Sequence, residues 1–241
     1  PALNAKTVVH DGINYDCTGT KAKVKKYNTG SPYSGAIVIP ETFSEGGTTY
    51  TVVATNANAF LDCTELTSVT LPNSCVTIGR NCFKGCTALT QDPTPSTATS
   101  IGNGYLQGCS SITEVTVPTG VSGTFTAQNW EGMTSLKKIT FADSNKPFKM
   151  NLLAFTTDVT TAPTTPVEEI YFGRNIDAST YANNQQPFHN MKWLKSVTFG
   201  GEATTVDGTM FQGCTALETV TFAEGNKIDS IGGSAFASCK S

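Results

Sequence analysis

The sequence predicts a solenoid, a right-handed β/α superhelix in which short repeated turns stack on one another. Two recurring patterns and a bias in composition predict it. The first pattern is apolar-x-x-apolar-x-apolar, as in Leu66-Thr-Ser-Val-Thr-Leu71, and it starts at residues 66, 89, 112, 136, 167, 194 and 217. The second places Cys or Met three residues after a large apolar residue, as in Phe83-Lys-Gly-Cys86. The bias is towards Thr, which supplies 39 of the 241 residues and, being β-branched, favours strands over long helices.

The spacing of the strand pattern indicates how the chain buries its apolar residues. Successive starts are 23, 23, 24, 31, 27 and 23 residues apart. A unit of this length cannot enclose a hydrophobic core alone, so the units must stack. Each unit predicts one short strand of a parallel β-sheet on one side of the solenoid. The segment from Ile78 to Cys86 is too short for a full helix. We therefore expect short helical turns and loops on the opposite side, with Gly79, Gly102 and Gly232 at the bends.

The N-terminal residues follow a different pattern. Residues 8–15 read as two strands around an Asp11-Gly12 turn, and a third alternating strand follows. We expect residues 1–34 to form a small β cap, which covers the core and the strand edge that a first turn would expose. Residues 35–241 then form the solenoid of about seven to eight turns with a period of about 23, and longer turns within 142–187.

The repeat resembles the leucine-rich repeats of the BspA-like type, which occur in bacterial cell-surface proteins. The matching residues are Leu-Thr-Ser-Val-Thr-Leu-Pro-Asn-Ser at 66–74, then Ile78-Gly79 and Phe83-Lys-Gly-Cys86-Thr-Ala-Leu89. The resemblance implies a leucine-rich-repeat solenoid. It also implies a non-enzymatic, adhesin-like interaction module that binds a host or bacterial surface protein or glycan. Such repeats are scaffolds for many partners, so the resemblance does not identify the ligand.

Location and bulk charge give further expectations. The chain begins at Pro1 without a signal peptide, and with the family resemblance we expect an extracellular or cell-surface protein whose export signal has been removed. No apolar run reaches the roughly 20 residues of a transmembrane helix, so we expect no membrane insertion of this segment. A net charge of −3 gives no bulk attraction to nucleic acid. We expect a monomer.

The cysteines read as core residues. Five of the eight occupy one repeat column, in which Met133 and Met191 also stand, and this exchange is typical of an apolar slot. We expect buried, reduced thiols there, whereas Cys75 and Cys82 are either a bridge or two small core residues. The column consists of Cys63, Cys86, Cys109, Cys214 and Cys239.

No motif in the sequence predicts catalysis. The chain contains no G-x-S-x-G, Walker or H-E-x-x-H motif. Glu168 and Glu169 are adjacent, so on a strand they point to opposite faces and cannot act as an acid/base pair. We therefore expect no enzyme activity, no catalytic residue, no metal site and no cofactor.

The outward positions of the strands predict a binding surface. One outward column holds Thr in most repeats but Tyr171 in one of them, with Lys138 and Glu169 beside it to orient a polar partner. An aromatic residue among small polar ones is a plausible contact for protein or glycan. The alternatives are a Thr ladder that only favours strand packing, and a structural spacer of a larger envelope protein with no ligand of its own. The candidate partner-binding residues are Tyr171, Lys138, Glu169, Thr140, Ser196, Thr198 and Tyr181.

One repeat departs from the pattern. In the unit that starts at residue 89, Asp92 and Thr94 stand at core positions, and Pro93 and Pro95 cannot donate ladder hydrogen bonds. We expect the sheet to be interrupted there, with Asp92 turned to solvent. We also expect burial of the large apolar residues that precede the Cys/Met column, namely Phe60, Phe83, Leu106, Trp130, Phe155, Phe188, Phe211 and Phe236.

Overall fold

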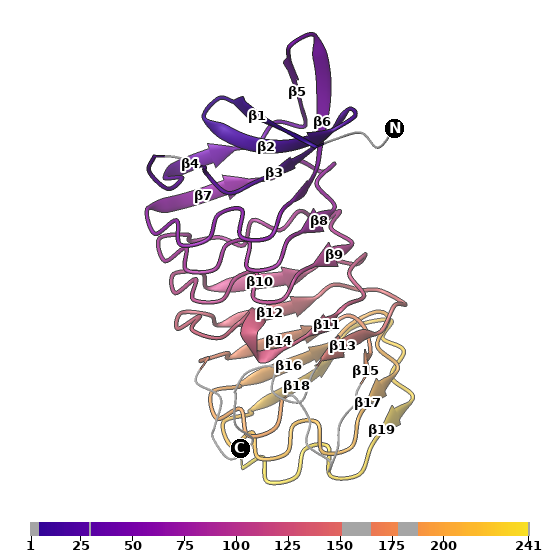
Figure 1. Cartoon of the computed structure of the whole chain (residues 1–241). Helices are drawn as coiled ribbons and strands as arrows, with labels where there is room; N and C mark the ends of the chain where they lie inside the picture. Colours follow the sequence, from indigo (N-terminus) through magenta and orange to yellow (C-terminus); the bar gives the residue numbers. More distant parts are fainter. Residues whose placement is uncertain (1–4, 29, 151–164, 178–187, 241) are drawn as a thin grey trace.

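A computed structural model describes residues 5–28, 30–150, 165–177 and 188–240. Its coils stack along one long axis, and the N-terminal strands lie at one end of the stack (Figure 1). The strand pattern forms a five-stranded parallel sheet along one side of the stack, as expected. In spatial order its strands are β10 (Glu114–Val117), β12 (Lys138–Phe141), β14 (Glu169–Phe172), β16 (Ser196–Phe199) and β18 (Thr219–Phe222).

Nearer the N-terminus the same side carries a separate pair of parallel strands, β4 (Gly35–Val38) and β7 (Leu66–Thr70). Between β7 and β10 the unit that starts at residue 89 forms no strand on this side, as its prolines predict. The sheet on this side is therefore interrupted once, at the departing repeat.

The side chain of Asp92 forms hydrogen bonds at this interruption, which corrects the expectation that Asp92 turns to solvent. The residue is half-buried. Its Oδ1 accepts hydrogen bonds from the backbone N–H and the hydroxyl of Thr94 at 3.0 and 2.6 Å, and its Oδ2 accepts from the N–H of Thr116 in β10 at 3.3 Å. Burial raises the pKa of this carboxyl to about 6. The side chain thus replaces the backbone carbonyl that a strand would have offered to β10.

A second set of short parallel strands runs along another side of the coils. The column of Ile78, which we expected to lead into a helical turn, is part of it. These strands pair coil to coil: β8 pairs with β9, β11 with β13, β13 with β15, and β17 with β19. They are β8 (Thr77–Ile78), β9 (Ser100–Ile101), β11 (Thr124–Phe125), β13 (Phe148–Met150), β15 (Ile176–Asp177), β17 (Thr205–Val206) and β19 (Ser230–Ile231).

The expected helical turns are wrong. Among the described residues the only helix is the three-residue 3-10 helix η1 (Ala127–Asn129). The segments instead consist of stacked β-turns with alternating hydrogen bonds. The N–H of Cys63 donates to the carbonyl of Phe60 in its own coil at 3.2 Å, whereas the N–H of Phe60 donates to Cys82 in the next coil at 2.8 Å.

The backbone conformation explains why no helix forms there. The residue before each Cys or Met has a positive φ, which an α-helix of L-residues cannot continue through. Short polar residues and Gly reach this conformation at the lowest cost. The residues concerned are Asp62, Gly85, Gly108, Gly132, Asn190, Gly213 and Ser238.

The N-terminal strands are hydrogen-bonded to the solenoid. The hairpin predicted around Asp11-Gly12 is confirmed, with φ of 47° and 77° at these two residues. It joins a mixed sheet in which β3 pairs in parallel with β6, and β6 with β8 and β8 with β9, so one sheet links both regions. The strands are β1 (Lys6–His10), β2 (Ile13–Thr18), β3 (Lys21–Val24), β5 (Thr42–Glu45) and β6 (Thr48–Thr55).

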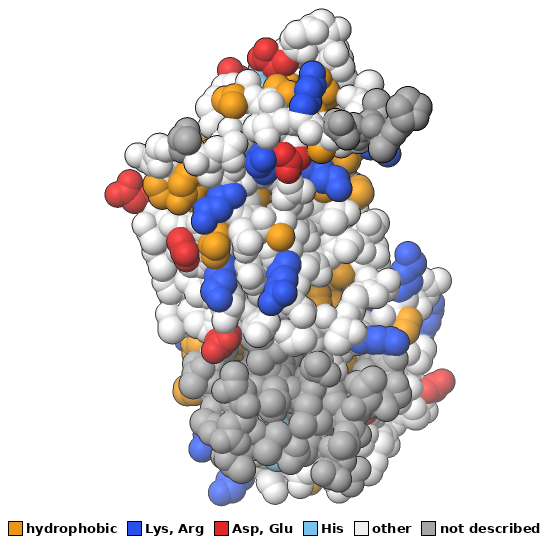
Figure 2. Space-filling view, viewed as in Figure 1, with side chains coloured by type: hydrophobic (Ala, Val, Ile, Leu, Met, Phe, Trp, Pro, Cys, Tyr) orange, Lys and Arg blue, Asp and Glu red, His pale blue; other side chains and the backbone are white. Residues whose placement is uncertain are grey.

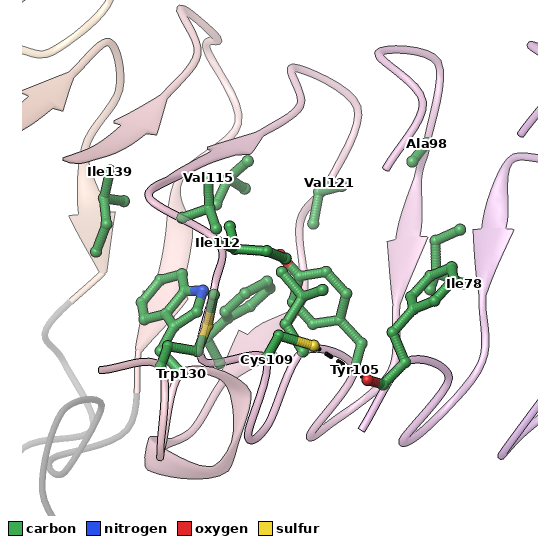
Figure 3. Packing of buried hydrophobic residues seen from close by; sticks show 14 of the residues in the cluster. Ile78, Ala98, Tyr105, Cys109, Ile112, Val115, Val121, Trp130 and Ile139 are labelled. Carbon is green, nitrogen blue, oxygen red and sulfur yellow. Dashed lines mark hydrogen bonds between the residues drawn. The ribbon is translucent and has the colours of Figure 1, made fainter. Parts of the chain in front are cut away.

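The core is a set of like side chains stacked from coil to coil (Figure 3). The rings of Phe60 and Phe83 lie parallel, with centroids 5.1 Å apart and planes at 8°. Phe236, in the last coil, is only partly buried, and Phe155 lies outside the described residues. The other members of the column are fully buried, which confirms the expectation for Phe60, Phe83, Leu106, Trp130, Phe188 and Phe211.

All eight cysteines lie in the described part of the chain and are free thiols, of which seven are buried. In the repeat column the thiols of Cys86, Cys109, Cys214 and Cys239 each donate a hydrogen bond to a backbone carbonyl one coil earlier, whereas that of Cys63 donates to Leu61 in its own coil. The Sγ of Cys109 lies 3.0 Å from the carbonyl oxygen of Phe83 (Figure 3). The column therefore serves packing and hydrogen bonding, and Cys75 and Cys82 are two core residues without a bridge.

Candidate functional site

The structure brings six of the seven candidate residues together on the outward face of the five-stranded sheet. The parallel register places Lys138 opposite Glu169 and Glu169 opposite Ser196. It also places Tyr171 between Thr140 and Thr198. Glu169 is exposed and the other five are partly exposed. Tyr181, the seventh, lies outside the described residues.

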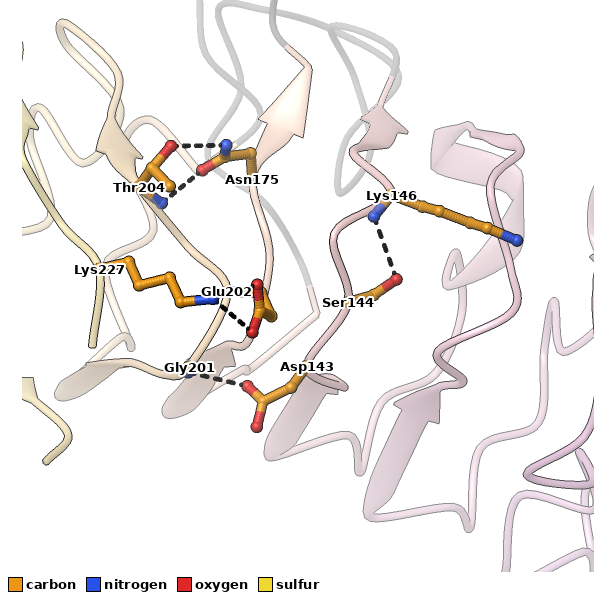
Figure 4. A network of polar contacts seen from close by, with 8 residues as sticks. All are labelled: Asp143, Ser144, Lys146, Asn175, Gly201, Glu202, Thr204 and Lys227. Carbon is orange, nitrogen blue, oxygen red and sulfur yellow. Dashed lines mark hydrogen bonds and ion pairs between the residues drawn. The ribbon is translucent and has the colours of Figure 1, made fainter. Parts of the chain in front are cut away.

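Tyr171 is held in place by contacts that the sequence analysis did not predict. Its hydroxyl donates a hydrogen bond to Oδ1 of Asp143 at 3.0 Å. The same oxygen accepts the N–H of Gly201 at 3.0 Å (Figure 4). The hydroxyl end of the ring lies against Gly200, where any Cβ atom would collide with it. Partial burial and the hydrogen bond to Asp143 raise the pKa of Tyr171, so the hydroxyl stays protonated at neutral pH.

The charges on this side pair differently from the expected arrangement. Lys138 and Glu169 are neighbours in register, but among the described residues no ion pair joins them. The ion pairs lie one position earlier, where Nζ of Lys137 contacts Glu168 at 2.8 Å and Nζ of Lys195 contacts it at 2.7 Å. These hydrogen bonds lower the pKa of Glu168 to about 2. The sequence carries the signal, because Lys, Glu and Lys alternate in that column.

Behind the sheet face, Arg174 holds three coils together. The side chain is 1% exposed, and its Nε, Nη1 and Nη2 each donate to a backbone carbonyl at 2.8 Å, those of Ala142, Val121 and Pro118 respectively. Burial lowers the pKa of Arg174, yet an arginine remains charged at neutral pH. The charge is therefore stabilised by carbonyl dipoles, and the turn after β14 is fixed against two earlier coils.

Two more polar contacts tie the coils beside the sheet to each other. Asn175 donates through Nδ2 to Oγ1 of Thr204 at 2.9 Å and accepts the N–H of Thr204 at 2.8 Å (Figure 4). Glu202 pairs with Nζ of Lys227 at 2.8 Å. These contacts span neighbouring coils, so they fix the edge next to Tyr171 without using any of the candidate residues.

The described residues offer no constellation for metal chemistry or membrane crossing. No group of three or more His, Cys, Asp or Glu in them lies close enough to hold a metal ion. Across the same residues, no helix has the length and apolar character needed to span a membrane. The chemistry that the site does offer is hydrogen bonding from hydroxyl groups, one aromatic face and separate charges.

Comparisons with known proteins agree with this architecture. The family model of the BspA type leucine rich repeat region matches residues 48–160 and 173–241, in six copies. A T. pallidum leucine-rich repeat protein is similar in structure, with a TM-score of 0.55 and 21% identity over 98% of this chain and 90% of that one. A leucine rich cell surface protein from Faecalibacterium prausnitzii A2-165 gives a TM-score of 0.54 and 19% identity over 98% and 87% of the two chains. The comparison with curated proteins found no match. At these identities the solved structures show the fold, and the family model covers most of the chain.

The chain therefore belongs to the BspA-type leucine-rich repeat family, whose members are generally non-enzymatic repeat modules of the interaction type.

Proposed function

We propose that the chain is a non-enzymatic binding module of an extracellular or cell-surface protein, and that its sheet face around Tyr171 contacts a surface protein or glycan. The observation that carries this proposal is the fixed position of Tyr171. A partner that stacks on a ring already held by Asp143 loses little conformational entropy on binding. A leucine rich cell surface protein among the fold neighbours supports the location.

The surroundings of Tyr171 favour a polar partner. Thr140 and Thr198 flank the ring and expose hydroxyl groups that both donate and accept hydrogen bonds. Glu169 is exposed, and neither it nor Lys138 belongs to an ion pair within the described residues. An aromatic face among hydroxyls and unpaired charges suits a sugar ring or a polar protein loop.

A glycan and matrix-protein array with the purified chain tests the proposal. For each ligand found, we compare Tyr171→Ala with Tyr171→Phe, which keeps the ring but loses the bond to Asp143. We expect the Ala variant to lose at least about tenfold in affinity and the Phe variant less, because buried aromatic contacts dominate such interfaces.

A matched control comes from the opposite end of the chain. The double variant Lys21→Ala/Lys23→Ala removes two exposed charges from β3 and should leave the affinity unchanged. Loss of affinity in that variant alone would move the site to the N-terminal strands. An array without any ligand would favour the alternative of a structural spacer.

A further inference from the structure

A pocket is lined by residues of the N-terminal strands, which lie several coils from β14, the strand that carries Tyr171 (Figure 1). It has a volume of about 430 Å³ and lies between the β1–β2 hairpin and β4. The hairpin contributes His10, Asp11 and Tyr15, and β4 contributes Ala36 and Val38. None of its described lining residues belongs to the sheet face proposed above.

One wall of this pocket is a free strand edge. The N–H groups of Gly35 and Ile39 donate to carbonyls on the β7 side at 2.9 Å. Because backbone groups alternate in direction along a strand, those of Ala36 and Val38 point away from β7. No described strand pairs with β4 on that side, and the side chain of Val38 is 73% exposed. An exposed edge of this kind is a template for one more strand.

An unpartnered polar group lies in the wall of the pocket, covered from solvent. Tyr15 is 0% exposed, and no described residue forms a hydrogen bond with its hydroxyl. Burial raises the pKa of Tyr15, so the hydroxyl remains protonated and can both donate and accept. Buried polar groups in folded proteins almost always have partners. A hydroxyl that lacks one in the wall of a pocket gains a partner when the polar group of a ligand displaces the atoms that cover it.

The charges around the pocket indicate the sign of that ligand. Asp11 lies at the rim with its side chain 90% exposed, and Glu45 contacts Nδ1 of His10 at 3.0 Å. Exposed Glu41 directly follows Pro40, which lines the pocket. Figure 2 shows acidic, basic and hydrophobic side chains next to one another near β4 and β7. Of the described residues that line the pocket, none is Lys or Arg.

We propose that this groove binds an extended basic peptide. The peptide pairs with the outward backbone groups of Ala36 and Val38 as an added strand, and places a Lys or Arg side chain in the pocket over Tyr15. Main-chain hydrogen bonds supply affinity in this mode, and the pocket for one side chain supplies specificity. The acidic rim attracts the cation, and the hydroxyl of Tyr15 gains a partner.

Fluorescence polarisation with short labelled peptides tests the proposal. The probe is Thr-Val-Lys-Val-Thr, with Thr-Val-Glu-Val-Thr as the charge control and an N-methylated form of the Lys peptide as the backbone control. We expect the Lys peptide to bind at least about tenfold tighter than either control, because one loses charge complementarity and the other loses main-chain donors. Absence of binding at about 1 mM peptide, or equal binding of the N-methylated form, would overturn the proposal.

Three variants of the protein distinguish binding of an added strand from other modes of peptide binding. Val38→Pro removes an N–H that bonds nothing in the described structure, with Val38→Thr as its matched control, and we expect a loss of about tenfold for Pro alone. Tyr15→Phe removes only the unpartnered hydroxyl, so we expect weaker peptide binding with an unchanged or higher urea midpoint. Equal binding by all three variants, competition by neutral oligosaccharides, or an edge covered by a second copy in a concentration-dependent dimer would contradict a peptide site.

Discussion

Glycine at three equivalent positions lets successive coils approach closely. A Cβ atom on Gly79, Gly102 or Gly232 would collide with the backbone of the preceding coil. None of the three has a positive φ. We expected these glycines for the sharpness of a bend, and the structure gives a different reason, which is the space between coils.

The close approach of the coils predicts that a single added methyl group at one of these glycines destabilises the fold. Gly102→Ala places a Cβ against backbone atoms of Arg80, which cannot move without shifting the coil. We expect a loss of about 1–3 kcal/mol in the free energy of unfolding, measured by urea denaturation. Gly123→Ala is the control, because a Cβ there meets nothing within 4 Å, and it should change stability by less than about 0.5 kcal/mol. Equal midpoints for the two variants would contradict the close approach.

At the scale of the elements, the column of cysteines makes the stability of the fold depend on pH. Burial raises the pKa of Cys109 and that of Cys214 to about 12. Each thiol also donates to a carbonyl of the previous coil, at 3.0 and 3.1 Å. A thiolate could not donate that bond, so the folded state requires the protonated form.

The sign of the pH dependence follows from these pKa values. Below the ordinary thiol pKa near 9, both folded and unfolded chains keep the proton. Between that value and about 12 only the unfolded chain releases it, so stability falls as pH rises. We expect a loss on the order of 2 kcal/mol per thiol at about pH 11. Urea midpoints measured from neutral to alkaline pH should fall less steeply for Cys109→Ala/Cys214→Ala than for the parent chain. Parallel slopes would show that these thiols are not buried.

The elements differ in how far the sequence predicts them. The strands of the five-stranded sheet follow from apolar alternation, because one face of each strand must be buried. The two-residue strands such as β8 are too short to show a period, so they were missed. The helical turns were wrongly expected because the pattern of apolar spacing hid the positive φ at Gly85 and its equivalents. That column of Gly, Asn and Asp is the signal that predicts turns instead.

The residues of the candidate site also differ in how far the sequence predicts them. Outward positions such as Tyr171 and Thr140 follow from alternation within one strand. Asp143 and Arg174 do not, because their partners lie 28 or more residues away in sequence. A contact between coils depends on the register of the stack, and apolar spacing alone does not specify which polar residues it brings together.

At the scale of the whole molecule, stability varies along the stack because each coil contacts only its neighbours. The last strands of this chain have more exposed core positions than the central ones. Phe222 in β18 is 41% exposed and Ile231 in β19 is 55% exposed, whereas Phe141 in β12 is 0% exposed.

This gradient predicts the order of hydrogen exchange. We expect amides of β18 and β19 to exchange at least about tenfold faster than those of β12 and β14, since local opening is easiest where few buried contacts resist it. Mass spectrometry of the deuterated chain measures the rates, at two protein concentrations to detect any covering of the end by a second copy. Uniform exchange along the stack would contradict a nearest-neighbour solenoid.

The alternating hydrogen bonds of the stacked β-turns have a mechanical consequence. The bonds between coils run along the long axis, so a force that separates the two ends acts on every layer, and the weakest layer separates first. Each coil that detaches releases about 23 residues, or about 75 Å of extended chain. We therefore expect the molecule to lengthen under tension in increments of one coil, with work dissipated at each step.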